Sequence, residues 1–528
     1  MTSISELLRS TLFYSPEGDL SMMHPGLPPG WAALVGVAVV VLSLRTLVAL
    51  RKPAVERQVR WIAPSAPGAI MRHVAALGPW LLLVLKIALA ALFLLIVTAG
   101  LFGTPIPERN LATVLTWNVW WAGLILTIFF VGSFWCAVCP WDTLAGWLVR
   151  RRLVRRASPN NSLNLRVPRM IRSVWPALLL FIGLTWLELG TGLTTTPRTT
   201  AILGLAMVVL ATVSLALFER KAFCRYFCPV GRTIGFYSQL APVELRPADI
   251  EVCARCTSLE CYHGTDRVEP CPTHLVMGRL TENTYCTSCG NCVSSCPSKN
   301  IFWRLRPPSI EAMQNARPHW DEACFMLALL ALTDFHGITM MPLWKEGMGS
   351  FARLVSDSGT LLLSFTIALL ASLAVPTMLY SGAVAVTHRI AGIAIEYKQL
   401  FSGLAFVALP LAFAYHLAHN LGHVVRESTG IWTLFSNPLG TGMQPLSVAE
   451  KQARHMELLI RPELLFTLQA GLMLFGFWVA LQVLRHRGQR LLPGGALTGF
   501  TLLPMILLAV AFTGFHLWLL MQPMAMRL

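Results

Sequence analysis

Long apolar segments separated by short polar loops dominate this chain of 528 residues. A helix that crosses the hydrocarbon core of a bilayer needs about 20 predominantly apolar residues. Ten segments approach or exceed that length, which predicts a polytopic α-helical membrane protein of about ten spans. The predicted spans are residues 31–50, 76–101, 112–135, 174–192, 199–218, 323–343, 359–381, 399–422, 463–484 and 496–520.

Composition and charge support this class and orient the chain. Only 13% of the residues are charged, whereas soluble domains carry about 25%. The net charge of +16 gathers in the loops after the first, third and ninth predicted spans, at 51–72, 150–172 and 485–490. Lys and Arg mark cytoplasmic loops, so we interpret this charge as topology and not as nucleic-acid binding. Both termini then face the periplasm, in the inner membrane of a bacterium.

The segment 240–315 interrupts the apolar pattern and is predicted to be cytoplasmic. The first 20 residues lack a basic stretch followed by an apolar run, so no cleaved signal peptide is expected. The predicted organisation is a periplasmic segment at 1–30, a five-helix membrane domain at 31–239, an inserted domain at 240–315 and a second five-helix membrane domain at 316–528.

Eight cysteines in the inserted segment have the spacing of iron–sulfur ligands. Cys286, Cys289, Cys292 and Cys296-Pro297 read C-x2-C-x2-C-x3-C-P, the bacterial ferredoxin spacing for a 4Fe-4S cluster. Upstream, Cys253, Cys256, Cys261 and Cys271-Pro272 form a looser version. In two-cluster ferredoxins the last cysteine of the run serves the other cluster. This predicts an α+β ferredoxin-like domain with one cluster on Cys253, Cys256, Cys261 and Cys296, and a second on Cys286, Cys289, Cys292 and Cys271. A zinc site at Cys253, Cys256 and Cys261 is the alternative.

Two further cysteine pairs end predicted spans. Cys136 and Cys139-Pro140 follow the third span, and Cys224 and Cys228-Pro229 follow the fifth. Four thiols at one membrane face could hold a third cluster or another metal, act as a dithiol relay, or pack as inert small side chains. The thirteenth cysteine, Cys324, is interpreted as inert.

Two Cys-Pro motifs at span ends, followed by a two-cluster segment, resemble the NosR/NapH group of membrane polyferredoxins. The resemblance covers about residues 76–310, and CcoG (RdxA) is a more distant relative of the same pattern. Cys224-x3-Cys228-Pro229 matches the C-x3-C-P motif of the group, whereas Cys136-x2-Cys139-Pro140 is one residue shorter. The resemblance implies electron transfer across or along the inner membrane, toward periplasmic reductases or the assembly of their metal centres. Residues 1–30 do not match the periplasmic flavin domain of NosR, so covalent flavin is not expected.

A histidine-rich helix marks the second membrane domain. At 100° per residue, His416, His419 and His423 fall within about a 60° arc of one helix. Ionisable residues within spans are costly and usually functional. Three interpretations stay open: a haem b or quinone site, a copper site, or histidines that only hydrogen-bond at the interface. His and Met residues predicted at the same outer surface are His336, Met340, Met341, Met348, His455, Met456, His516, Met521, Met524 and Met526.

Other polar and aromatic residues in the spans carry weaker signals. Five tryptophans in or beside the third span, at positions 117, 120, 121, 135 and 141, fit an interfacial belt without further function. Lys86 lies in the second span, where it could neutralise a carboxylate or a quinone oxygen or extend toward the interface. Glu188 and Asp334 are the sparse acids in or near spans. The chain has no phosphate-binding loop, so ATP-driven transport is not predicted.

These features predict an electron-transfer protein, an oxidoreductase component more than a stand-alone enzyme. It would pass electrons between a cytoplasmic donor or the quinone pool and a membrane or periplasmic acceptor such as a reductase, a cytochrome or a maturation system. The bilayer and that redox protein are its expected partners, with no nucleic acid. A copper-handling protein with a redox-active ferredoxin domain is the alternative of another class, and a redox-sensing regulator ranks last.

Overall fold

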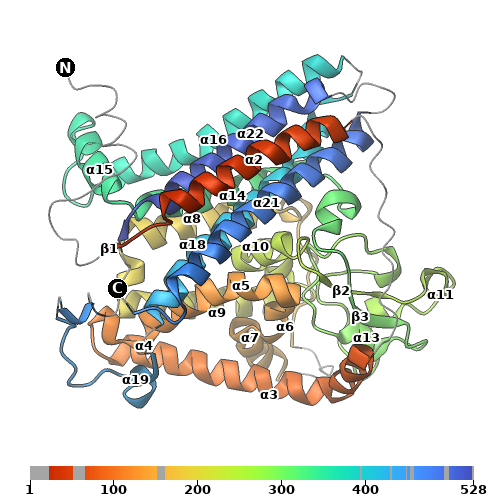
Figure 1. Cartoon of the computed structure of the whole chain (residues 1–528). Coiled ribbons are helices and arrows are strands. Elements are labelled where there is room, and N and C mark those ends of the chain that lie inside the picture. The colour runs from red at the N-terminus through yellow and green to blue at the C-terminus, as the bar shows by residue number, and fades with distance from the viewer. Residues whose placement is uncertain are drawn as a thin grey trace, which may run out of the picture.

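A computed structural model describes residues 23–50, 66–151, 161–392, 395–428, 431–447, 449–451, 453, 457–492 and 499–525. The predicted basic loops 51–72 and 150–172 lie partly outside these ranges, because residues 51–65 and 152–160 are not described. His455, Met456 and Met526 also lie outside them. The described part is mainly helical, and its long helices run side by side through the molecule (Figure 1).

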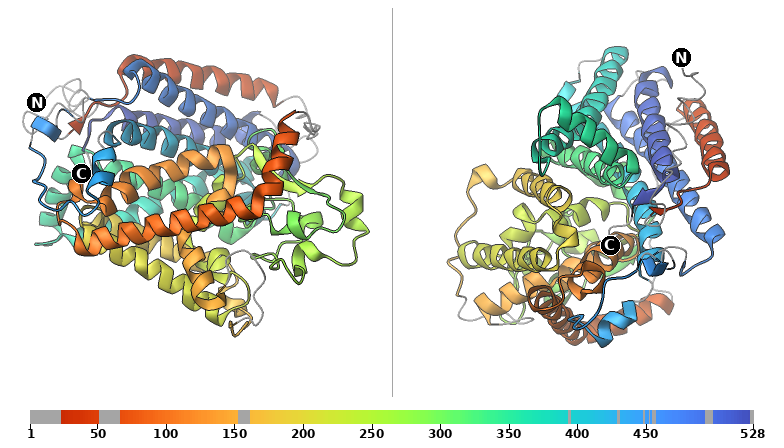
Figure 2. Two further views of the ribbon diagram at one scale, coloured as in Figure 1. Left: turned by 90° about the horizontal axis from the view of Figure 1, so that it is seen from below. Right: turned by 90° about the vertical axis from the view of Figure 1, so that its left-hand side faces the viewer.

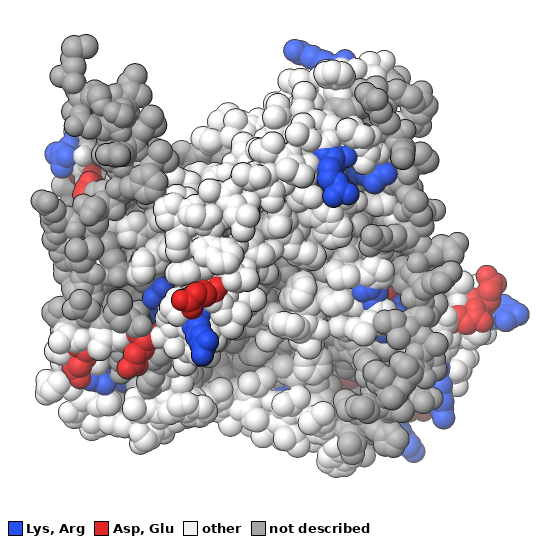
Figure 3. All heavy atoms as spheres, viewed as in Figure 1, with Lys and Arg blue, Asp and Glu red and all other residues white. Residues whose placement is uncertain are grey.

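Nine helical stretches among the described residues are long and apolar enough to cross a membrane. This confirms the predicted polytopic helical membrane protein. A tenth apolar helix, α8 (Trp175–Gly190), has 16 residues and is shorter than the predicted span 174–192. Charged side chains gather toward the two ends of the face drawn in Figure 3, and the band between them is almost free of charge. The nine stretches are α2 (Pro29–Ala49), Trp80–Phe102 of α3 (Ala66–Phe102), Leu111–Arg150, α9 (Pro197–Leu217), α14 (Trp320–Thr339), α16 (Leu362–Ala391), Tyr397–Glu427, α21 (Pro462–Leu491) and Phe500–Met521 of α22 (Gly499–Met521).

Two of these stretches are broken helices. The stretch Leu111–Arg150 contains a π-helix and a 3-10 turn between its α-helical parts, and Tyr397–Glu427 contains one 3-10 turn. Irregular backbone at membrane depth is tolerated where protein covers it. The parts are α4 (Leu111–Thr113), η3 (Val114–Trp120), α5 (Trp121–Val131), η4 (Gly132–Phe134), α6 (Trp135–Val138), α7 (Pro140–Arg150), α17 (Tyr397–Leu404), η10 (Ala405–Val407) and α18 (Ala408–Glu427).

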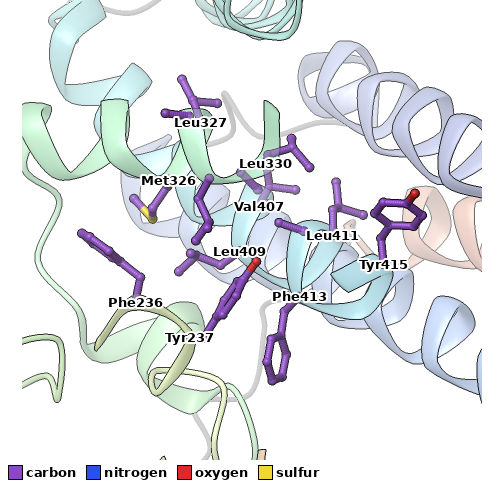
Figure 4. Close-up of a cluster of buried hydrophobic side chains, with 14 of the residues drawn as sticks. Phe236, Tyr237, Met326, Leu327, Leu330, Val407, Leu409, Leu411, Phe413 and Tyr415 are labelled. Atoms are coloured by element: carbon purple, nitrogen blue, oxygen red, sulfur yellow. The ribbon is translucent and has the colours of Figure 1, made fainter. Parts of the chain in front are cut away.

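α18 lies at the centre of the bundle. Every residue of the apolar part of Tyr397–Glu427 is buried, and α18 packs against α5, α14 and α21. Apolar side chains of α10 (Pro229–Tyr237), α14 and α18 form a continuous core there (Figure 4). α2 packs against α21 and α22, so the first span lies with the C-terminal helices and not with the helices that follow it in sequence (Figure 1).

The cysteine-rich segment forms a small unit at one end of the bundle (Figures 1 and 2). Its antiparallel strands β2 (Val243–Pro247) and β3 (Ile301–Leu305) pair with Val243 opposite Leu305. Between them lie α11 (Ile250–Ala254), α12 (Glu260–His263), η8 (Met277–Arg279) and α13 (Asn291–Ser295). A buried ion cluster of Glu244, Arg246, Arg306 and Glu311 fastens β2 to η9 (Glu311–Asn315), which leads into α14.

Short elements complete the described part. β1 (Met23–His24) pairs with β4 (Met524–Ala525) at the end of the bundle opposite to β2 and β3 (Figure 1). α15 (Pro342–Leu354), which carries Met348, follows α14 as a helix that the hydropathy pattern did not predict. The remaining helices are η2 (Pro107–Arg109), η5 (Arg169–Ile171), η6 (Leu193–Thr195), η7 (Phe223–Phe227) and α19 (Ile431–Ser436).

Candidate metal centres

Four cysteines come together at the tip of the small unit, and we call them the distal group: Cys253, Cys256, Cys261 and Cys296. All four line one cavity, and Cys261 interacts electrostatically with the other three. Asn300 donates from Nδ2 to Cys253 Sγ at 3.4 Å and from its backbone N–H to Cys296 Sγ at 3.4 Å. Hydrogen bonds to ligand sulfurs are one of the factors that set the potential of an iron–sulfur centre.

A second set, the middle group, lies between the distal group and the membrane helices: Cys271, Cys286, Cys289 and Cys292. Cys292 interacts with the other three and also with Cys261 of the distal group. Cys271 therefore interacts with the later motif and Cys296 with the earlier one. The exchange of the two last cysteines between the clusters stays a prediction.

The third set, the juxtamembrane group, joins the two Cys-Pro motifs: Cys136, Cys139, Cys224 and Cys228. The residue before a proline is held in extended backbone, and proline is favoured as the first residue of a helix. Cys139 (ψ 125°) thus ends α6 and precedes α7, and Cys228 (ψ 111°) ends η7 and precedes α10. Both breaks leave the thiols beside each other, and Cys136 interacts with all three of its partners.

Basic residues surround the juxtamembrane group. Lys221 forms a 2.5 Å ion pair with Asp142 and interacts with both Cys224 and Cys289, so its charge lies between the juxtamembrane and middle groups. Arg232 donates to the Cys224 carbonyl at 2.9 Å. Lys86 lines a cavity of about 80 Å³ with Asp142 and Lys221. Four thiolates around a cluster carry negative charge, which these cations would balance.

Direct hydrogen bonds fasten the middle group to the membrane helices. Ser133 and Ser288 share a hydrogen bond of 2.8 Å between their hydroxyls. Arg220 donates to the Cys271 carbonyl at 3.0 Å, and the Lys221 N–H donates to the Pro272 carbonyl at 3.1 Å. The middle group is therefore held directly against the ends of the helices that carry the juxtamembrane group.

The buried thiols fit metal-bound cysteines only after they lose their protons. Burial raises the pKa of Cys286 and the pKa of Cys228 to about 12. Metal binding releases such protons. Among the described residues, no set of three or more His, Cys, Asp or Glu is arranged to hold a single ion. Sets of four cysteine thiolates are the usual ligands of a 4Fe-4S cluster.

The five tryptophans of the third stretch line one apolar cavity of about 290 Å³ inside the membrane part. Cys139 of the juxtamembrane group and Pro229 form part of its wall, and Thr233 and Glu188 are among its few polar lining residues. The sequence pattern predicts an interfacial belt for these tryptophans, whereas the structure places them around one cavity. Their spacing on both sides of the Cys136 motif was a signal that could have placed them around the thiols.

Among the described residues, the histidines of the second membrane domain pack against different aromatic and imidazole rings. His416 contacts Trp121 and lies 3.3 Å, Nδ1 to Oη, from Tyr237. His419 and His423 contact each other with ring centroids 4.7 Å apart, and His336 contacts His419 at 5.3 Å. The His419 ring also lines a small cavity of about 20 Å³.

The remaining outer residues take separate places. His516 forms a 2.7 Å contact from Nε2 to Asp334 Oδ1. Met340, Met341, Met348 and Met524 are buried apolar residues. Cys324 packs at the edge of the hydrophobic core.

Two comparisons found known proteins that are similar to this chain. A family described as "4Fe-4S binding domain" matches residues 113–159 and 200–241, which contain all four cysteines of the juxtamembrane group. A protein of Escherichia coli (strain K12) with the name "Putative electron transport protein YccM" is 29% identical over 153 residues. That match covers 27% of this chain and 40% of YccM, so the chain spans less than half of this relative. No solved structure matches.

Proposed function

We propose that this membrane protein transfers electrons through three 4Fe-4S clusters held by the distal, middle and juxtamembrane groups. The observation that carries the proposal is the arrangement of twelve cysteines as three neighbouring sets of four, from the tip of the small unit to the ends of the membrane helices. The family match over the juxtamembrane cysteines supports the third set.

The side chains around the thiols have distinct tasks in this proposal. A bound 4Fe-4S cluster supplies one-electron oxidation and reduction. Asn300 donates to sulfurs of the distal group, and the Gly231 N–H donates to Cys228 Sγ at 3.2 Å. Lys221 balances negative charge between the middle and juxtamembrane groups. The bond between Ser133 and Ser288 fixes the spacing of these two groups.

The tryptophan cavity supports the quinone pool as one redox partner. It is apolar, lies within the membrane part and shares Cys139 with the juxtamembrane group. Ligand sites are typically apolar cavities with a few polar groups that orient the ligand. A lipid-soluble quinone matches that chemistry. In this proposal the small unit lies on the cytoplasmic side of the bacterial inner membrane, where it meets a soluble donor or acceptor.

Iron and acid-labile sulfide content of the anaerobically purified full chain tests the number of clusters. We expect about twelve irons and twelve sulfides from three cubanes. The double variant Cys136→Ser with Cys139→Ser should fall to about eight of each, and Cys324→Ser should stay at twelve.

Two results would contradict the proposal in different ways. A wild-type content of eight, unchanged in the double variant, would remove the juxtamembrane cluster. Four irons together with zinc would leave a single cluster and a structural site, and the electron-transfer proposal would then fail.

A further inference from the structure

A series of buried titratable side chains runs through the centre of the membrane part, and none of the three cysteine groups uses it. Its members come from three adjoining helices, α14, α18 and α22, and from the end of α10. Titratable residues are expensive inside a membrane, and chains of Asp, Glu and His there are typical of proton relays. The members are Tyr237, Asp334, Tyr415, His416, His419, His423, Glu427 and His516, and the half-buried His336 lies beside His419.

The inner end of the series reaches the tryptophan cavity. Thr233 lines that cavity and lies one helical turn before Tyr237 on α10. The Tyr237 hydroxyl contacts His416, and Thr333 and Asp334 are also close to it. Figure 4 shows Tyr237 extending from α10 toward α18. The series therefore begins beside the place where a quinone would bind.

The middle of the series crosses between helices. Asp334 on α14 is bonded to His516 on α22 at 2.7 Å, and both are almost completely buried. The His516 ring stacks on Tyr415 of α18, with centroids 4.6 Å apart and an angle of 14°. Tyr415 then contacts His419 one turn later, with centroids 5.7 Å apart.

The outer end reaches the side of the bundle that carries β1 and β4. His419 contacts His423, whose Nδ1 lies 2.6 Å from Glu427 Oε1. The cavity of about 20 Å³ that touches His419 is also lined by Gly26 and Met524, next to the β1–β4 pair. A space of this size holds about one water molecule.

Several atoms along the series need partners that the described protein does not supply. Asp334 Oδ2, Tyr415 Oη, His516 Nδ1 and Glu427 Oε2 are buried and have no hydrogen-bond partner among the described residues. Buried polar atoms are almost always paired, and ordered water is the usual partner where protein is not. If the pairs Asp334–His516 and His423–Glu427 served packing alone, water would not be required at each of these positions.

We propose that this series, which we call the proton path, conducts protons between the tryptophan cavity and the end of the bundle that carries β1 and β4. The proposal rests on the quinone part of the proposed function. When a quinol is oxidised, its electrons leave toward the cysteine groups and its protons leave along the path. Each imidazole takes a proton on one nitrogen and releases one from the other. Electrons and protons therefore leave toward opposite ends of the molecule.

The side of proton release tests this proposal. The full chain is placed in vesicles that contain ubiquinol, with the small unit facing outward and a pH-sensitive dye inside. Oxidised cytochrome c is added outside, where it accepts one electron per molecule and cannot cross the membrane. Each quinol then reduces a pair of cytochrome c molecules and releases both protons. With the wild type we expect the vesicle interior to become acidic.

Two variants and a control locate the path. Asp334→Asn and His516→Phe should each slow cytochrome c reduction and interior acidification about a hundredfold, the effect of losing a positioned proton-transfer group. Their iron content should equal that of the wild type. His388→Phe should behave as wild type, because His388 lies on α16 outside the path and bonds the Ile395 carbonyl.

Acidification of the outer medium, or unchanged rates in both variants, would overturn the proton path while leaving quinol oxidation in place. If the wild type does not reduce cytochrome c, the quinone part of the proposed function falls and the proton path falls with it. The iron content still tests the clusters in that case.

Discussion

At the scale of single residues, the recurring feature of this chain is a cysteine followed by proline. Proline fixes its own φ and forces the preceding residue into extended backbone. Cys139, Cys228 and Cys296 have ψ between 111° and 125°, and each ends a helical segment. Where a helix ends at such a cysteine, the thiol is directed away from that helix and toward other segments of the chain. Because this geometry depends only on a cysteine and the proline that follows it, the motifs could be recognised in the sequence before any contact was known.

The exchange of the last cysteines can be tested with Cys271→Ala. Because Cys271 lies with Cys286, Cys289 and Cys292, we expect the variant to lose the cluster of the middle group, about four of twelve irons. The distal group, which contains Cys296, should keep its cluster. The measurement is iron content together with the electron paramagnetic resonance signals of the reduced protein. Loss of the signal that Cys253→Ala also removes would assign Cys271 to the distal group instead.

Glu282 makes the stability of the junction between the small unit and the membrane helices depend on pH. Burial, with Glu322 and Glu311 nearby, raises the pKa of Glu282 to about 8. The folded state therefore holds a proton that the unfolded chain releases near its ordinary pKa of about 4.3. Stability should fall as pH rises from about 4.3 to 8, by at most about 1.4 kcal/mol for each unit by which the folded and unfolded pKa values differ. Apparent Tm against pH should be flatter in Glu282→Gln, and an equal slope in both proteins would contradict this assignment.

At the scale of helices and strands, hydropathy found the apolar helices but misplaced several ends. α16 continues through Pro376 to Ala391, whereas the sequence predicted an end at 381. Proline removes one backbone hydrogen bond, and within a membrane bundle neighbouring groups compensate for that loss. Hydropathy measures transfer into lipid, so it does not detect a helix that continues beyond the apolar part or breaks inside it.

Close packing of α18 against α21 depends on Gly476. A Cβ at this position would collide with Ala414 Cβ and would lie 2.8 Å from the Pro410 carbonyl. Gly476→Ala should lower the stability by about 1–3 kcal/mol through overpacking. Gly471→Ala is the matched control on the same helix, because a Cβ there meets open space. Apparent Tm in detergent measures both, and an equal Tm for the two variants would show that the helices can separate without cost.

At the scale of the whole molecule, residues that are distant in sequence form the sites. The tryptophan cavity draws its wall from α3, the third stretch, α8, α9 and α10. His416, His419 and His423, which the sequence predicts on one helix face, have different neighbours. His416 contacts Trp121, whereas His419 and His423 contact each other. A helical wheel gives directions around one axis, but the partners depend on which helices pack on each side.

A large side chain placed in the tryptophan cavity tests quinone binding there without changing any cysteine. Ala201 lines it from α9 and is 1% exposed, whereas Val209 on the same helix is 57% exposed on the outer surface. Ala201→Phe should abolish most quinol-dependent reduction of the clusters while the iron content stays at the wild-type level. Val209→Phe should leave both unchanged. Equal quinol-dependent rates in the two variants would place the quinone elsewhere.

The sequence by itself determined that this is a polytopic helical membrane protein, and it located the cysteine-rich segment that begins at Cys253 and ends at Cys296. Its spans follow from transfer into lipid, and its cysteine motifs follow from local backbone geometry. Both properties depend on neighbours along the chain. Only the tertiary structure brought the two Cys-Pro motifs together as the juxtamembrane group, placed α2 with the C-terminal helices, enclosed the tryptophan cavity and linked Asp334 to His516. These contacts depend on helix packing between distant segments, where the apolar pattern is the same on every side and does not specify the partner.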